Sequence, residues 1–226
     1  MSIAIFVKTP GYSPVNTRLA GTIGREAAEA LHLQSAAVVA AVAGASGERV
    51  YWAVAEAAAH HAPPWRDLPI LLQDTGDLGA RVCGLDHRVL GEPGQALLIG
   101  ADAPQLEARE LTRAAEWLRR SGPRLVIGEA TDGGFWLFGG NREIPAPLWS
   151  GVAYGRDDTA QQFRDTLGPR GEWLALRRHT DLDTGEDLGA VAAELEALDQ
   201  ALPQQRELAA SLRRLQTTRA TARQAV

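Results

Sequence analysis

Hydrophobic and polar positions along the chain follow two alternating patterns. Short apolar or β-branched runs predict strands, whereas longer stretches with apolar residues three or four positions apart predict helices. We expect strands at residues 3–7, 49–54, 70–73, 96–100, 124–128, 135–139 and 173–176. We expect helices at residues 25–43, 78–90, 107–120 and 159–167, and from Glu186 onward. This alternation is typical of an α/β fold with a mostly parallel sheet flanked by helices.

The order of elements changes after residue 138, but nothing indicates a second domain. A loop containing Pro145 and Pro147 precedes the last helices, and the chain has no internal repeat or low-complexity linker. A chain of 226 residues can bury a sizeable hydrophobic core. We therefore expect one domain over residues 1–202, followed by a C-terminal helical extension and loose tail over residues 203–226.

Composition and charge narrow the function classes. The single cysteine, Cys83, cannot form an internal disulfide, and no Cys/His spacing resembles a zinc site. The N-terminus lacks the features of a signal peptide, and the longest apolar stretch, residues 36–43, is far shorter than the roughly 20 residues of a membrane span. A net charge of −5 gives no electrostatic basis for nucleic-acid binding. We expect a cytoplasmic protein that binds neither nucleic acid nor membrane, with a homodimer as an allowed assembly.

The first chemical signal is a glycine- and proline-containing loop, residues 8–19, that follows the first strand. It carries Lys8 and Arg18 beside exposed backbone amides, and together these groups can neutralise a phosphate. The loop matches neither a Walker motif nor a dinucleotide fingerprint. An ordinary connecting loop with solvated charges would have the same residues.

The second signal is Asp102, which stands directly after the uninterrupted apolar strand at residues 96–100. Such a strand is buried on both faces, so its end lies at the edge where open α/β sheets bind ligands. A carboxylate there suits Mg²⁺ or Mn²⁺, which take one or two carboxylates plus substrate phosphates. Asp102 could alternatively cap the helix that follows Pro104.

A third signal, Asp132-Gly133-Gly134, precedes an aromatic strand. Glycines permit close backbone approach to a ligand and would leave Asp132 free to contact substrate hydroxyls or to accept a proton. An Asp-Gly hairpin turn accounts equally well for these residues.

Two further stretches carry charge. In residues 179–188, Asp183 could give a metal its second carboxylate, whereas Asp187 is explained by capping of the following helix. In residues 74–82, Arg81 could reach a phosphate or form an ion pair with Asp77 four residues earlier.

Taken in order, these stretches resemble the bacterial family of nucleotide-diphospho-sugar transferases. This family is a branch of the GT-A fold long catalogued as a domain of unknown function, and it includes a glycosyltransferase proposed for arsenosugar biosynthesis. The resemblance rests on six motifs between Ile3 and about Leu195. They are Lys8 and Pro10 with residues 17–19, residues 76–81, 100–104 and 132–136, Trp149-Ser150, and residues 181–188.

The resemblance implies a nucleotide-sugar donor, a small-molecule acceptor of unknown identity and a divalent cation, Mg²⁺ or Mn²⁺. It places Asp102 and Asp183 at the metal, and Asp132 with Asp102 at the reacting groups. The residues expected to contact the nucleotide and its phosphates are Lys8, Thr17, Arg18, Arg81 and Gly100. Those expected to contact the sugar or the acceptor are Gly133, Gly134 and Trp149.

The chain departs from the family pattern at three positions. Ser13 replaces a usual glycine, Asn16 a usual lysine and Glu129 a common proline. The loss of a cation would weaken diphosphate binding, and Glu129 would add negative charge close to Asp132.

Three functions remain open at this stage. The resemblance favours a metal-dependent glycosyltransferase. A nucleotidyltransferase, which would join a nucleoside triphosphate to a small phosphorylated acceptor and release pyrophosphate, is the main rival. A non-catalytic nucleotide-binding protein is the third reading.

Overall fold

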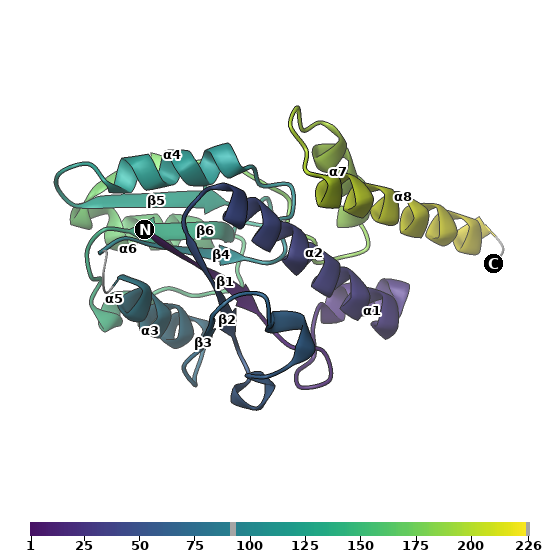
Figure 1. Cartoon of the computed structure of the whole chain (residues 1–226), viewed down its shortest axis with the longest axis horizontal. Helices are drawn as coiled ribbons and strands as arrows, with labels where there is room; N and C mark the ends of the chain where they lie inside the picture. Colours follow the sequence, from purple (N-terminus) through teal and green to yellow (C-terminus); the bar gives the residue numbers. More distant parts are fainter. Residues whose placement is uncertain (91–93, 225–226) are drawn as a thin grey trace.

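The computed structural model describes residues 1–90 and 94–224. Its centre is a seven-stranded sheet in the order β3-β2-β1-β4-β6-β5-β7 (Figure 1). The strands are β1 Ser2–Val7, β2 Arg49–Val54, β3 Ile70–Leu72, β4 Ala96–Gly100, β5 Arg124–Glu129, β6 Phe135–Gly140 and β7 Glu172–Ala175. Only β6 runs against its neighbours, β4 and β5. The expected mostly parallel, mixed α/β sheet is therefore confirmed.

Helices cover both faces of this sheet, because successive side chains of each strand point to opposite sides. Ile3 and Ile5 of β1 join one core with α2, α4, α7 and α8, whereas Ala4 joins a second core with α3, α5 and α6. The helices are α1 Thr17–Ile23, α2 Arg25–Ala45, α3 Leu78–Leu90, α4 Ala108–Leu118, α5 Ala146–Ser150, α6 Thr159–Leu167, α7 Asp187–Glu196 and α8 Pro203–Gln224. Short 3-10 turns occupy Ala57–Ala59, Pro63–Trp65 and Gly168–Arg170.

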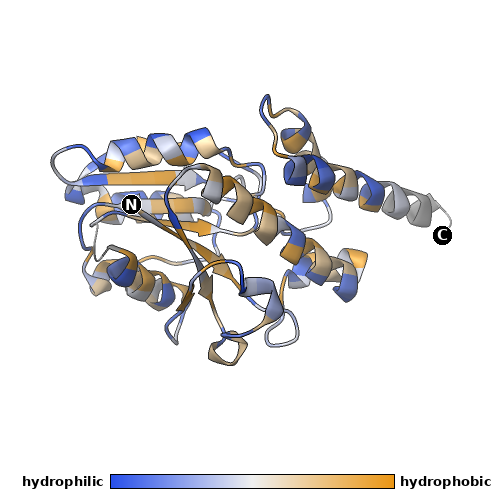
Figure 2. Ribbon diagram, viewed as in Figure 1, coloured by the Kyte–Doolittle hydropathy of each residue, from blue (hydrophilic) through white to orange (hydrophobic). Residues whose placement is uncertain are grey.

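Hydropathy follows these layers. The strands are mainly apolar, while the helices alternate apolar and polar faces (Figure 2). Two helices, α1 and α5, were not predicted, and α5 lies where a proline-rich loop was expected. With 7 and 5 residues, they are too short for helical periodicity to appear in the sequence.

Helix α2 is a core helix, although its length and composition would also allow it to cross a membrane. Val38, Val39 and Val42 are buried against the sheet and its neighbouring helices. Ser35, on the same helix, donates a hydrogen bond of 2.6 Å to the backbone carbonyl of Ala101. The apolar side of α2 is thus accounted for by packing within the domain.

The C-terminal helix α8 packs against α7 and α2. Its residues Leu208 and Leu212 are fully buried, and the side chain of Gln205 donates hydrogen bonds of 3.0 Å to the carbonyls of Pro104 and Leu106. The helix therefore contacts the segment that follows Asp102. Residues 225–226 of the expected loose tail lie outside the described residues.

A buried ionic cluster anchors the segment that leads to α7. His179 has no exposed surface and lies between the carboxylates of Glu110 on α4, at 2.9 Å, and Glu194 on α7, at 3.5 Å. Burial alone would lower the pKa of His179, but the hydrogen bond to Glu110 and the nearby Glu194 raise it overall. Burial opposes ionisation of Glu194 too, but hydrogen bonds from His179, Thr180 and Gln105 lower its pKa overall.

The raised pKa of His179 predicts that stability falls as pH rises. The protonated imidazole stabilises the fold fully below its unfolded pKa of about 6.5, and this contribution is lost as pH passes the higher folded pKa. Substitution His179→Gln should cost roughly 3 kcal/mol at pH 6, because it leaves two partly buried carboxylates without their cation. It should also remove the decline above pH 6.5 in urea unfolding.

The matched control is His60→Gln, which replaces an exposed histidine. This variant should keep both the wild-type stability and its decline with pH. An unchanged pH dependence in His179→Gln would show that the buried imidazole does not hold the extra proton.

Candidate functional site

A cavity of about 720 Å³ opens at the carboxyl ends of β1 and β4. Its walls come from the loop after β1, the starts of α1 and α3, the turn before β6 and the segment after His179. This is the edge at which open α/β sheets bind ligands. Of the expected site residues, those lining it are Lys8, Thr17, Arg18, Arg81, Gly100, Asp102, Asp132, Gly134 and Asp183.

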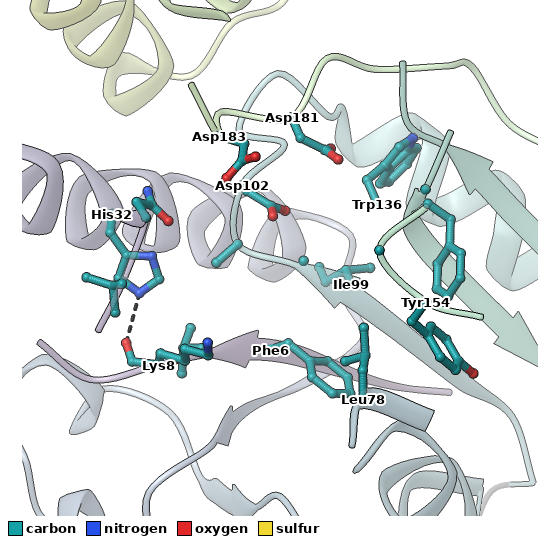
Figure 3. A pocket seen from close by; sticks show the side chains of 18 of the residues that line it. Phe6, Lys8, His32, Leu78, Ile99, Asp102, Trp136, Tyr154, Asp181 and Asp183 are labelled. Carbon is teal, nitrogen blue, oxygen red and sulfur yellow. Dashed lines mark hydrogen bonds between the residues drawn. The ribbon is translucent and has the colours of Figure 1, made fainter. Parts of the chain in front are cut away.

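Asp102 projects into this cavity from the loop that ends β4 (Figure 3). Its carboxylate folds back over Gly100, where a Cβ atom would lie only 2.3 Å from Oδ1, so a larger residue there would displace the Asp102 side chain. Helix α4 does not begin until Ala108, and the side chain of Glu110 accepts the Glu107 N–H at its start. Asp102 is therefore not the cap of that helix.

A second aspartate, Asp181, lies beside Asp102 and Asp183 on the same side of the cavity (Figure 3). Burial and the neighbouring carboxylates, Asp102 foremost, raise the pKa of Asp181 to about 9. The pKa of Asp102 is raised too, by desolvation foremost and then by the negative charges of Asp183 and Asp132. Oδ1 of Asp181 is buried and has no hydrogen-bond partner within the described residues.

Asp183 is paired with one of the expected phosphate ligands. Its Oδ2 lies 2.7 Å from Nη1 of Arg18, and the two side chains are 38% and 69% exposed. The segment is held from behind by Asp187, whose carboxylate accepts the backbone N–H groups of Asp183, at 3.2 Å, and Thr184, at 2.6 Å. Asp187 thus fixes the turn before α7. It does not cap the helix as expected, because Glu186 is the N-cap and no side chain caps α7.

Lys8 lies across the cavity from the aspartates (Figure 3). Its backbone carbonyl is 2.9 Å from the imidazole of His32, a buried residue of α2. Glu56 accepts the Thr9 N–H at 3.0 Å and the hydroxyl of Ser13. The loop after β1 is therefore fixed at several points, and within the described residues the ammonium of Lys8 has no carboxylate partner.

Arg81 forms no ion pair with Asp77. Its Nε lies 3.4 Å from the Asp77 backbone carbonyl, and its Nη1 donates to the side-chain oxygen of Gln73 at 3.3 Å. The Asp77 carboxylate instead accepts the Ala80 N–H at the start of α3. The guanidinium is consequently available to a ligand in the cavity.

Asp132 both closes a tight turn and lines the cavity, the two roles that its sequence allowed. Oδ1 of Asp132 accepts the Gly134 N–H at 2.8 Å, which closes a tight turn, yet the exposed side chain still lines the cavity. Gly133 has φ of 91°, and a Cβ atom there would lie 1.8 Å from the carbonyl oxygen of Asp157. We expected Gly133 to contact the substrate. Instead, Gly133 packs the turn against the loop before α6 and does not line the cavity.

Trp149 requires a second correction. The residue is only 1% exposed, packs against Phe138 and Phe163, and donates its indole N–H to the carbonyl of Ile144 at 3.2 Å. It does not line the cavity. An aromatic residue after a proline-rich loop fills the core here, and it does not contact the acceptor.

Glu129 does not add free negative charge near Asp132. Its carboxylate lies 3.0 Å from Arg164 and 2.6 Å from Arg178. The hydrogen bond from Arg178, helped by Arg164, lowers the pKa of Glu129. Two arginines therefore compensate this departure from the family pattern.

Sequence reasoning missed Asp181, His32 and Tyr154. Asp181 stood in the same Asp-x-Asp stretch as Asp183, so spacing could have included it. His32 lies on an apolar helix and Tyr154 in an irregular loop, and neither position carries a local signal. Both line the cavity only because distant segments meet there.

The carboxylates do not form a closed metal cage. In residues 1–90 and 94–224, no group of three or more His, Cys, Asp or Glu side chains is arranged to hold a metal ion by itself. The oxygen donors and the unpartnered oxygen of Asp181 suit a hard cation whose remaining ligands are phosphate and water.

Solved structures share this fold. A protein from Desulfovibrio desulfuricans G20, provisionally named a nucleotide-diphospho-sugar transferase, is 22% identical with a TM-score of 0.79, over 95% of this chain and 97% of that chain. A nucleotidyl transferase from Methanothermobacter is 15% identical with a TM-score of 0.55, over 87% of this chain and 99% of that chain. The 4-diphosphocytidyl-2C-methyl-D-erythritol synthase from Anaerococcus prevotii DSM 20548 is 9% identical with a TM-score of 0.54, over 86% of this chain and 98% of that chain.

No curated protein matches the sequence. A family profile, however, matches residues 36–156, which is more than half of the chain and includes Asp102 and Asp132. The chain therefore belongs to the bacterial family described as "Uncharacterized protein conserved in bacteria (DUF2064)".

Proposed function

We propose that this protein is a metal-dependent glycosyltransferase that moves a sugar from a nucleoside-diphosphate donor to a small acceptor. The observation that carries this proposal is the convergence of Lys8, Arg18 and Arg81 with four aspartates on one cavity. Such a mixture suits a ligand that has both an anionic diphosphate and neutral hydroxyl groups. The fold shared with the Desulfovibrio protein supports the same assignment.

The strand order gives the cavity a direction. Arg81 and Lys8 follow β3 and β1, whereas Asp102 follows β4 and Asp132 precedes β6. Lys8 and Arg81 therefore come from one side of the strand order and Asp102 and Asp132 from the other, while Arg18 lies beside Asp183. We place the diphosphate between Lys8 and Asp102, with the sugar and the acceptor toward Asp132.

Asp102 and Asp183 would hold the divalent cation, Mg²⁺ or Mn²⁺. Two carboxylates plus phosphate oxygens are a common ligand set for these ions. When bound, the cation would neutralise the diphosphate and stabilise the charge that develops on the departing nucleoside diphosphate. Asp181 would add a further carboxyl group beside this site.

The chain's own residues divide the remaining work. Lys8 and Arg18 offset the negative charge of the leaving diphosphate. As the acceptor oxygen bonds to the anomeric carbon and the bond from that carbon to the diphosphate oxygen breaks, Asp132 takes the acceptor's proton. Phe135 and Trp136 line the cavity near Asp132 and would form an apolar wall beside the sugar.

Nucleotidyl transfer is the second candidate, because the Methanothermobacter and Anaerococcus proteins share the fold and are named for such reactions. The two activities release different products. Incubation with Mn²⁺ and nucleotide sugars should release a nucleoside diphosphate, and triphosphates with sugar phosphates should yield no pyrophosphate. Pyrophosphate release would favour the second candidate, and nucleotide binding without turnover would identify a binding protein.

Substitution Asp102→Asn should lower turnover by about 10² to 10³, because it removes one preorganised charge from the metal site. Transfer of radiolabelled sugar in Mn²⁺ would measure this loss. The control is Asp165→Asn, an exposed carboxylate on α6 outside the cavity, which should retain wild-type turnover. Near-normal activity of a folded Asp102→Asn enzyme would remove Asp102 from the mechanism.

Substitution Asp183→Asn should have opposite effects with and without metal. In EDTA it frees Arg18 from its ion pair, so nucleoside diphosphate should bind about two- to fivefold tighter, the range expected for an exposed pair. In Mn²⁺ it removes a metal ligand, so binding should weaken. Isothermal titration calorimetry under both conditions would show the reversal.

Asp132→Asn serves as the control for this reversal. It removes the same charge from the cavity but has no pairing with Arg18. It should change metal-free binding less than Asp183→Asn does. Equal gains in the two variants would mean that overall charge, and not release of Arg18, sets the affinity.

A further inference from the structure

We propose that Arg81, held in place by Gln73, selects a donor whose base carries a keto oxygen over one with an amino group at the same position. This inference rests on the proposed function and names the class of nucleotide that the same cavity takes. Guanine and uracil belong to the keto class, and adenine and cytosine are their amino counterparts.

The side chain of Gln73 has only one orientation that satisfies its neighbours. Its Nε2 lies 3.3 Å from the backbone carbonyl of Val7 and 2.7 Å from that of Ala53. Carbonyl oxygens accept hydrogen bonds only, so the amide nitrogen must face them. Oε1 consequently faces Arg81, and Gln73 is tied to the ends of β1 and β2.

This orientation fixes the guanidinium of Arg81. Nη1 donates to Oε1 of Gln73 at 3.3 Å, and Nε lies 3.4 Å from the carbonyl of Asp77. Within the part of the chain that the structure describes, no carboxylate forms an ion pair with Arg81, although the residue lines the cavity. Its remaining N–H groups are donors that a bound ligand can use.

The surroundings of Arg81 suit a nucleotide base. Arg81 lies in the first turn of α3, and its partner Gln73 directly follows β3. Around it the cavity is lined by Phe6, Leu78 and Val82, an apolar setting suited to a flat ring. With the diphosphate at Lys8 and Asp102, the nucleoside reaches toward this end.

A guanidinium discriminates between bases because it can only donate hydrogen bonds. O6 and N7 of guanine both accept, and arginine commonly binds this pair of atoms with two hydrogen bonds. Adenine presents an amino group where guanine has O6, and cytosine presents one where uracil has O4. Each amino group sets donor against donor at Arg81.

The test measures the affinity of the full chain, in Mn²⁺, for GDP, IDP, ADP, UDP and CDP by isothermal titration calorimetry. GDP should bind at least about fivefold tighter than ADP, the lower end of what a bidentate arginine–base contact gives. IDP should match GDP because it keeps O6 and N7, and UDP should bind tighter than CDP. Equal affinities within each keto and amino pair would overturn the inference.

Variants assign the discrimination to its residues. Arg81→Lys keeps the charge without the fork, and Gln73→Met removes the support, so both should bring the GDP to ADP ratio close to one. Arg88→Met is the matched control, because Arg88 lies on the same helix but pairs with Asp74 and does not line the cavity. Its ratio should remain that of the wild type.

Two outcomes would contradict the assignment in different ways. If Arg81→Lys weakens all five nucleotides by the same factor, Arg81 binds phosphate and the inference is wrong. If no diphosphate binds the wild-type protein in Mn²⁺, the proposed function itself fails, and base selection fails with it.

Discussion

Repulsion among carboxylates is the constraint on which the site depends. Asp102, Asp132, Asp181 and Asp183 face one cavity, and desolvation, followed by their mutual charge, raises the pKa of Asp102 and Asp181. Such an arrangement costs free energy in the absence of a cation, because like charges oppose one another where the surrounding protein screens them poorly. Arg18 relieves part of this repulsion by pairing with Asp183. The cavity thus holds negative charge that a cation and its phosphate ligand would balance.

The rest of the fold holds these groups in position against their repulsion. The backbone N–H of Leu182 donates to the carbonyl of Asp102 at 2.9 Å, which joins the two aspartate-bearing segments directly. Behind them, His179 connects the second segment to α4 and α7, and Asp187 fixes its turn. Buried hydrogen-bonded charges of this kind keep a surface loop from relaxing away from the cavity.

The departures from the family pattern have different consequences. Ser13 bonds to Glu56 and so supports the loop after β1, while Glu129 is neutralised by Arg164 and Arg178. Asn16 is the departure that reaches the cavity, since it lines the wall and has φ of 42°. Asparagine tolerates that left-handed conformation better than most residues do. The cation usually supplied at this position is absent, which leaves Lys8 and Arg18 as the cations nearest the proposed diphosphate position.

The sequence by itself determined the strands, the longer helices and the mostly parallel sheet, because apolar periodicity is a local property that any sufficiently long element displays. It also pointed to Lys8, Asp102 and Asp132, since each stands within three residues of a strand end, and strand ends meet at one edge of the sheet. Asp183 was indicated by the acidic stretch before the last helices. Tertiary structure decided which side chains line the cavity and which are buried in the core. It buried Trp149 in the core, turned Gly133 toward Asp157, and brought Asp181, His32 and Tyr154 to the cavity. These outcomes depend on packing between segments far apart in the chain, and no local pattern of residues encodes such contacts.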